Sequence, residues 1–218
     1  MEQKYDRRKA RLEKQMADLE IRREKALARQ RRYDARFAKE TAEVPGHFAH
    51  GINFYKLCWV FFICCFLGVV IETVFCFIAS GRISQRTGLV WGPFNLIYGF
   101  GAVLLTISLQ RLRGKNDRYI FVGGAIIGGA FEYFCSWLQE TVTGTVSWDY
   151  SGMPFNLNGR INLLYCLFWG VLALVWVKEI YPRISGWIEQ NVSRTYGVAL
   201  TWVIVVFMLL NSLVSGAA

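Results

Sequence analysis

Charged side chains are scarce over most of this sequence. Residues 44–218 hold only 11 basic and 7 acidic side chains, whereas residues 1–43 hold 14 and 9. Over the whole chain 54% of the residues are hydrophobic and 19% are charged, against about 25% charged in an ordinary soluble domain. This scarcity excludes a soluble globular domain and a disordered chain. It predicts an all-α fold, a polytopic helical membrane bundle preceded by a charged segment.

Several chemical motifs are missing as well. The six cysteines lie in apolar stretches without CxxC spacing, which excludes a disulfide-stapled secreted scaffold. The sequence contains no GxxxxGK(S/T) phosphate loop and no HExxH or GxSxG motif. His47 and His50 have no cysteine or acidic residue beside them. We therefore predict no enzyme activity, no cofactor, no metal site and no nucleic-acid partner, and no ATP hydrolysis of the phosphate-loop kind by this chain alone.

The N-terminal segment is predicted to be a long charged cytoplasmic helix with its linker, over residues 1–46. Residues 1–43 contain neither glycine nor proline, which favours a helix, and no apolar run precedes residue 57 that would suit a secretory signal. Three interpretations stay open: a solvated helix, a weak coiled coil or partner-binding helix, and a helix attracted to anionic lipid headgroups. The second interpretation rests on two rows of residues that recur every seven positions. One row is apolar and consists of Tyr5, Leu12, Leu19, Ala26 and Tyr33; the other contains the polar residues Lys9, Arg23 and Gln30.

The remainder, residues 47–218, is predicted to be a transmembrane domain with about five transmembrane helices. A bilayer-crossing helix needs about 20 mostly apolar residues. Basic residues divide 22 to 3 between the two sides of such a bundle, so the positive-inside rule places the N-terminus in the cytoplasm and the C-terminus outside. After Pro182, an apolar stripe predicts a helix lying in the membrane interface. The predicted spans are 57–79, 93–110, 119–138, 161–177 and 198–214.

Polar residues are predicted to gather at one depth of the membrane. Glu72 and Glu132 each lie seven residues from the outer end of their helical segments, which places both about 10 Å below the surface. Carboxyl groups at such a depth face the bundle interior or a wet cavity. We therefore predict a substrate or ion pathway lined by Glu72, Glu132, Glu140, Asn95, Tyr98, Arg82, Arg86 and Arg160.

The connector 139–160 is too polar and too rich in glycine and proline to face lipid. We expect it to fold back as a cap over the polar cluster, as a re-entrant segment in one interpretation, with an ion pair between Asp149 and Arg160. The glycines at 123, 124, 128 and 129 would let another helix approach closely. The predicted cap motif is Trp148, Asp149, Tyr150, Asn156 and Gly159.

Several blocks of the body resemble one bacterial membrane family. They are GLVWGPFNLIYGFGA (88–102), Glu132 and Glu140, WDYS (148–151), FNLNGR (155–160) and FWG (168–170). In order and spacing they are similar to the ABC-transporter permease family, type IV, over residues 57–180. The resemblance implies a multi-pass protein of the bacterial plasma membrane. Two departures bear on it: Leu96 stands where the family commonly has proline, and Arg86-Thr87 where it commonly has Asn-Arg.

Three classes of function fit these observations. The first is a transport or permease component, in which the carboxylates bind a cation or relay protons and the arginines select or gate. The second is a non-transporting scaffold or regulator that binds a partner through its charged N-terminal helix. The third, the least supported, is a membrane enzyme that uses two carboxylates as acid and base. The first interpretation also predicts a homo-oligomer in the bilayer and a separate cytoplasmic ATPase that grips residues 182–193.

Overall fold

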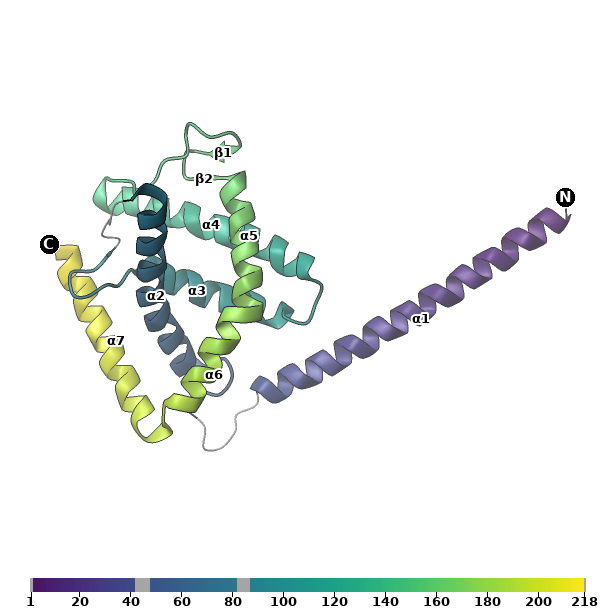
Figure 1. Cartoon of the computed structure of the whole chain (residues 1–218), viewed down its shortest axis with the longest axis horizontal. Helices are drawn as coiled ribbons and strands as arrows, with labels where there is room; N and C mark the ends of the chain where they lie inside the picture. The colour runs from purple at the N-terminus through teal and green to yellow at the C-terminus, as the bar shows by residue number, and fades with distance from the viewer. Residues whose placement is uncertain (1, 42–47, 82–86, 218) are drawn as a thin grey trace. The chain divides into compact units, whose positions relative to one another are not determined.

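A computed structural model describes residues 2–41, 48–81 and 87–217 (Figure 1). It divides the chain into two compact units, Met1–Glu40 and Thr41–Ala218. The first unit consists of helix α1, Glu2–Thr41, which forms because the segment lacks helix-breaking residues. Between residues 6 and 32 nearly every α1 side chain is exposed. The predicted linker up to residue 46, with His47, lies outside the described residues.

The second unit contains helices long and apolar enough to cross a bilayer. Within the described residues these are Phe54–Ile78 in α2 (Phe54–Ser80), Asp117–Thr143 in α4, Leu163–Asn191 in α5 to α6, and Arg194–Gly216 in α7 (Arg194–Ala217). Asparagines cap α2, α4 and α5: the side chains of Asn53, Asn116 and Asn162 each accept a backbone N–H of the first turn. Length and hydropathy therefore confirm a multi-pass helical membrane protein.

The predicted span 93–110 is wrong at its start. Helix α3 is Leu96–Leu109, followed by a short 3₁₀ turn, η1, Gln110–Leu112. Its 14 residues rise about 21 Å, less than the roughly 30 Å of the hydrocarbon layer. The turn at Gly92-Pro93 delays the helix, and the backbone N–H of Asn95 donates to the carbonyl of Cys65, halfway along α2, at 3.1 Å. Helix α3 therefore begins beside the middle of a spanning helix.

The predicted end of the fourth span at residue 177 is also wrong. Helix α5, Leu163–Val175, passes through a π-helical turn, η2, Trp176–Ile180, directly into α6, Tyr181–Asn191. Pro182 lies directly after the π-helical turn, the kind of irregularity at which a helix accommodates a residue without a backbone N–H, and the charged residue Lys178 pairs with Asp117. The helix expected after Pro182 is present as α6 and continues the α5 helix (Figure 1); its place in the membrane interface stays a prediction.

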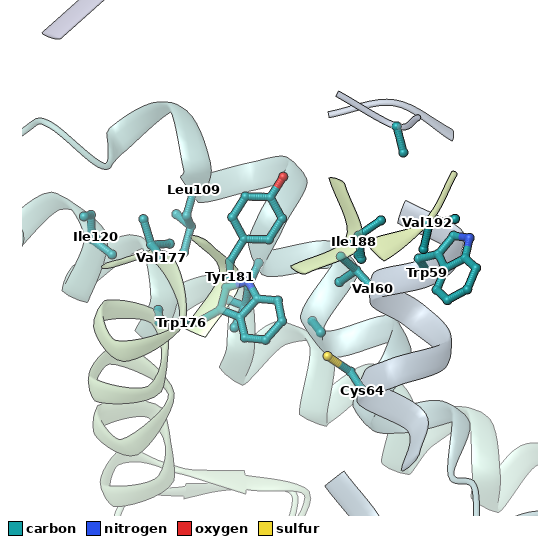
Figure 2. Close-up of a cluster of buried hydrophobic side chains, with 14 of the residues drawn as sticks. Trp59, Val60, Cys64, Leu109, Ile120, Trp176, Val177, Tyr181, Ile188 and Val192 are labelled. Atoms are coloured by element: carbon teal, nitrogen blue, oxygen red, sulfur yellow. The ribbon is translucent and has the colours of Figure 1, made fainter. Parts of the chain in front are cut away.

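The core of the second unit joins α2, α3, α4, η2 and α6 (Figure 2). Two buried indoles satisfy their N–H groups across helices: Trp59 donates to Thr201 at 3.0 Å and Trp176 to Thr106 at 2.9 Å. Labelled in Figure 2 are Trp59, Val60, Cys64, Leu109, Ile120, Trp176, Val177, Tyr181, Ile188 and Val192.

The predicted close approach at the α4 glycines is confirmed. A Cβ added at Gly124 would lie 2.2 Å from the Cβ of Ala173, and one at Gly128 would lie 2.3 Å from the Trp169 ring. Real Cβ atoms do not approach so closely, so the small residues are what allow α4 and α5 to pack in direct contact. This contact sets the distance between the two helices that carry the polar group described next.

Candidate functional site

Glu132 of α4 is at the centre of a polar group inside the apolar part of the bundle. One of its carboxyl oxygens, Oε1, accepts a hydrogen bond from the Tyr150 hydroxyl at 2.8 Å, and Oε2 accepts one from the Trp169 indole N–H at 2.7 Å. Trp169 belongs to α5, whereas Tyr150 comes from the loop between α4 and α5, residues 144–162. Both carboxyl oxygens are therefore held by donors, as a carboxylate in an apolar surrounding requires.

The 144–162 loop is shaped by its own polar side chains. Asp149 accepts hydrogen bonds from the backbone N–H and the hydroxyl of Ser151, at 2.8 and 2.6 Å, and Asn156 accepts the N–H of Gly159 at 3.0 Å. Gly159 has φ +68, and a Cβ there would meet Ser151 and Asp149, so only glycine suits this turn. The loop closes with a short hairpin, β1 (Asn156–Leu157) and β2 (Ile161–Asn162).

Two groups of this loop have shifted pKa values. The hydrogen bonds from Ser151 lower the pKa of the exposed Asp149 carboxyl. Burial, and then the neighbouring Glu132 carboxyl, raise the pKa of Tyr150. Tyr150 therefore remains a hydrogen-bond donor to Glu132 throughout the physiological pH range, which keeps the loop attached to α4.

The predicted ion pair between Asp149 and Arg160 is wrong. Arg160 instead pairs with Glu140 of α4, its guanidinium lies 5.8 Å from the ring centroid of Tyr133, and its Nη1 lies 3.5 Å from the Ser136 hydroxyl. Asp149 is engaged by Ser151, as described above. Trp148 closes the loop on itself, since its indole N–H donates to the Arg160 carbonyl at 3.0 Å.

Glu72 of α2 has a different set of partners. It accepts a hydrogen bond from the hydroxyl of Tyr98, in the first turn of α3. The side chain of Asn95 caps that turn by accepting the N–H of Ile97 at 3.0 Å. Tyr98 crosses α2 at Gly68, where an added Cβ would lie 2.2 Å from the Tyr98 ring. Arg82 and Arg86, also predicted here, lie outside the described residues.

The predicted residues thus gather into two polar groups in the structure. Glu72, Asn95 and Tyr98 lie between α2 and α3, whereas Glu132 is held by α5 and the 144–162 loop. Helix α3 contacts both α2 and α4. A single site shared by the two carboxylates stays a prediction.

Sequence reasoning missed an internal ion pair at the start of α2. Lys56 is fully buried, and its Nζ donates to the Ser185 carbonyl at 3.0 Å, the Ser185 hydroxyl at 2.6 Å and the Glu189 carboxylate at 2.5 Å. His50 Nδ1 lies 3.3 Å from the other oxygen of Glu189. A signal was available: Lys56 and Glu189 are single charges at the edges of apolar helices, where an unpaired charge is costly.

A second missed residue is Asn211 of α7. Its fully buried side chain accepts the N–H of Trp91 at 3.0 Å and donates to the Trp91 carbonyl at 2.7 Å. One turn further on, the Ser215 hydroxyl accepts the N–H of Val90 at 2.9 Å. Helix α7 therefore holds the non-helical segment that precedes α3 and satisfies its backbone, as irregular chain in an apolar layer requires.

The fold and these polar groups define a multi-span helical membrane protein with two irregular segments held to its helices by hydrogen bonds. Residues 59–215 match the family described as "Putative ABC-transporter type IV", and the chain belongs to this family. The match extends beyond the predicted limit at residue 180 and takes in α7 with Asn211. No curated protein and no solved structure matches the chain.

Proposed function

We propose that this protein is a transport component of the plasma membrane whose Glu132 group binds a cation or a proton. One observation carries the proposal: a carboxylate within a spanning helix is held by donors from two other segments, and one donor, Tyr150, comes from a loop. Ionisable groups at this depth are costly, so they are expected where function needs them. Glu72, with Tyr98, is the second carboxylate of the proposed pathway.

The proposed cycle couples the charge of Glu132 to the 144–162 loop. A proton or cation that binds Glu132 competes with the Tyr150 and Trp169 donors, because each donor stabilises the charged carboxylate that has nothing else bound. Loss of the Tyr150 bond frees the middle of the loop from α4, while the pair of Arg160 and Glu140 still ties the end of the loop to α4. We expect this pair to control entry to the group.

Flux in proteoliposomes tests the proposal. The full chain is reconstituted, and proton flux is followed with an entrapped pH-sensitive dye and sodium flux with a radioactive tracer. Glu132→Gln keeps the shape of the side chain and removes its charge, and we expect it to abolish the flux. Glu179→Gln is the matched control, because Glu179 is exposed and pairs with Arg183 one turn further along the same continuous helix. Unchanged flux in a folded Glu132→Gln protein would refute the role of the carboxylate.

A second function, a scaffold or regulator without transport, is favoured by a different observation. Both oxygens of Glu132 already have protein donors, which is also what a purely structural polar network shows, and α1 is a long exposed helix. The scaffold function is supported if the folded wild-type protein gives no more flux than protein-free vesicles. Transport driven by ATP would need a separate ATPase chain, and a gene for one beside this gene would support that partner.

A further inference from the structure

Helix α1 exposes large apolar side chains that nothing in the described chain covers. Leu12, Met16 and Leu19 are 52%, 64% and 63% exposed. They lie at successive steps of four and three residues, and the same steps continue through Arg23 to Ala26. This alternation places them on one face of a helix as the seam of a coiled coil, with Leu12, Leu19 and Ala26 at d positions and Met16 and Arg23 at a positions.

Most of the residues that flank this seam are acidic on one side and basic on the other. In the same register, the e positions hold Asp6, Glu13, Glu20 and Leu27, and the g positions hold Arg8, Gln15, Arg22 and Arg29. In a parallel two-stranded coiled coil, each g residue faces the e residue five positions later on the other helix. Arg8 then faces Glu13 of the second helix. An antiparallel pair would instead set g against g, arginine against arginine.

The membrane domain favours the same arrangement independently. Two copies inserted with the same orientation carry α1 on the same side of the bilayer, and each α1 is connected to the bilayer at its C-terminal end. A parallel pair then brings the two attachment points together at the same end of the coiled coil. Polar residues at the a positions, Arg23 among them, favour a coiled coil of two strands. A polar residue at an a position specifies the oligomeric state at a cost in stability. The long aliphatic part of an arginine side chain also lets its charged group reach water.

We propose that α1 pairs with α1 of a second copy of this chain in a parallel, in-register, two-stranded coiled coil. The seam supplies the apolar contact, and the pairing of Arg8 with Glu13 of the other helix favours the parallel, in-register arrangement. The polar a positions make the pairing weak in isolation, and confinement of both copies to one membrane raises their effective concentration. The proposal does not depend on transport.

Cysteine crosslinking of the full chain in membranes tests the proposal with a matched pair of variants. Ala26→Cys lies at d on the seam, and Ala28→Cys lies at f on the opposite face; both replace an exposed alanine by the same residue. A d residue faces its own counterpart at a separation that a disulfide can bridge. After mild oxidation we expect several times more disulfide-linked dimer from Ala26→Cys than from Ala28→Cys, with the wild-type chain and its six cysteines as the blank.

Charge reversal in the Ala26→Cys background tests direction and register. Glu13→Arg sets arginine against Arg8 twice in each dimer and should reduce the crosslinked fraction, and adding Arg8→Glu should restore it. Equal crosslinking at 26 and 28, as expected for a helix lying on lipid or bound to another protein, overturns the proposal. Failure of Arg8→Glu to rescue Glu13→Arg overturns the parallel register. Helix content by circular dichroism checks that every variant keeps α1.

Discussion

The buried pair of Lys56 and Glu189 predicts an asymmetric response to removal of its two charges. Lys56 is fully buried, whereas the Glu189 side chain is 22% exposed and also contacts His50. Glu189→Gln leaves a buried ammonium group without its counter-charge, and breaking a buried pair in this way costs about 3–5 kcal/mol of unfolding free energy. Lys56→Met leaves a partly hydrated carboxylate that keeps His50, so we expect a smaller loss, about 2 kcal/mol.

Reversible unfolding in mixed detergent micelles measures both values. The double variant Lys56→Met/Glu189→Gln removes both charges, and we expect it to be more stable than Glu189→Gln alone, because no unpaired buried charge remains. Ser185→Ala is the control for the neutral hydrogen bond and should lose about 1 kcal/mol. Equal losses for the two single variants, or additive losses in the double variant, would refute the assignment of the cost to a buried unpaired ammonium.

Three further predictions concern the irregular segments and the helix contact. Asn211→Leu leaves the N–H and carbonyl of Trp91 without partners; we expect a loss of about 2–4 kcal/mol in micelle unfolding and faster proteolysis between residues 87 and 95. Gly128→Leu forces a side chain into the Trp169 ring and should cost at least about 1–3 kcal/mol, whereas Gly152→Leu, in open space in the 144–162 loop, should unfold at an unchanged denaturant concentration. Because the pKa of Asp149 is lowered, its ionised form stabilises the 144–162 loop; this contribution is fully present above the ordinary carboxyl pKa and is lost as pH falls through the lower folded value. The protection factors of the loop amides, which correct the exchange rates for the intrinsic rate at each pH, should therefore fall below about pH 4, and Asp149→Asn should remove that dependence.

Hydropathy predicted the four long helices because the property that defines a membrane-spanning helix is local in the sequence. A backbone in an apolar layer must satisfy its own hydrogen bonds, and a continuous apolar stretch of sufficient length does so only as a helix. The ends of α3 and α5 were harder to predict, since they depend on contacts distant in sequence. The start of α3 coincides with the bond from Asn95 to Cys65, and where the helix continues beyond residue 177 its charged Lys178 meets Asp117 of α4.

The polar residues show the same division between local and distant information. The turn around Asp149 and Gly159 could be predicted, because its hydrogen bonds join residues close in the chain. The partner of Arg160 could not: Asp149 and Glu140 are both within reach along the sequence, and the choice depends on how far the loop folds back over α4. Lys56 and Glu189 are 133 residues apart, and only the packing of α6 on α2 brings them together.

The transport proposal and the dimer proposal can fail separately, and the extent of the family match explains why. The match begins at residue 59, after α1, and includes both carboxylates of the proposed pathway and Asn211. A coiled coil of α1 therefore adds an association to a membrane domain whose Glu132 group is held within one chain, since Glu132 finds Tyr150 and Trp169 without a second copy. Charge reversal at Glu13 should accordingly reduce crosslinking through position 26 while leaving unchanged any flux that depends on Glu132. Loss of both together would show instead that the pathway is built between two copies.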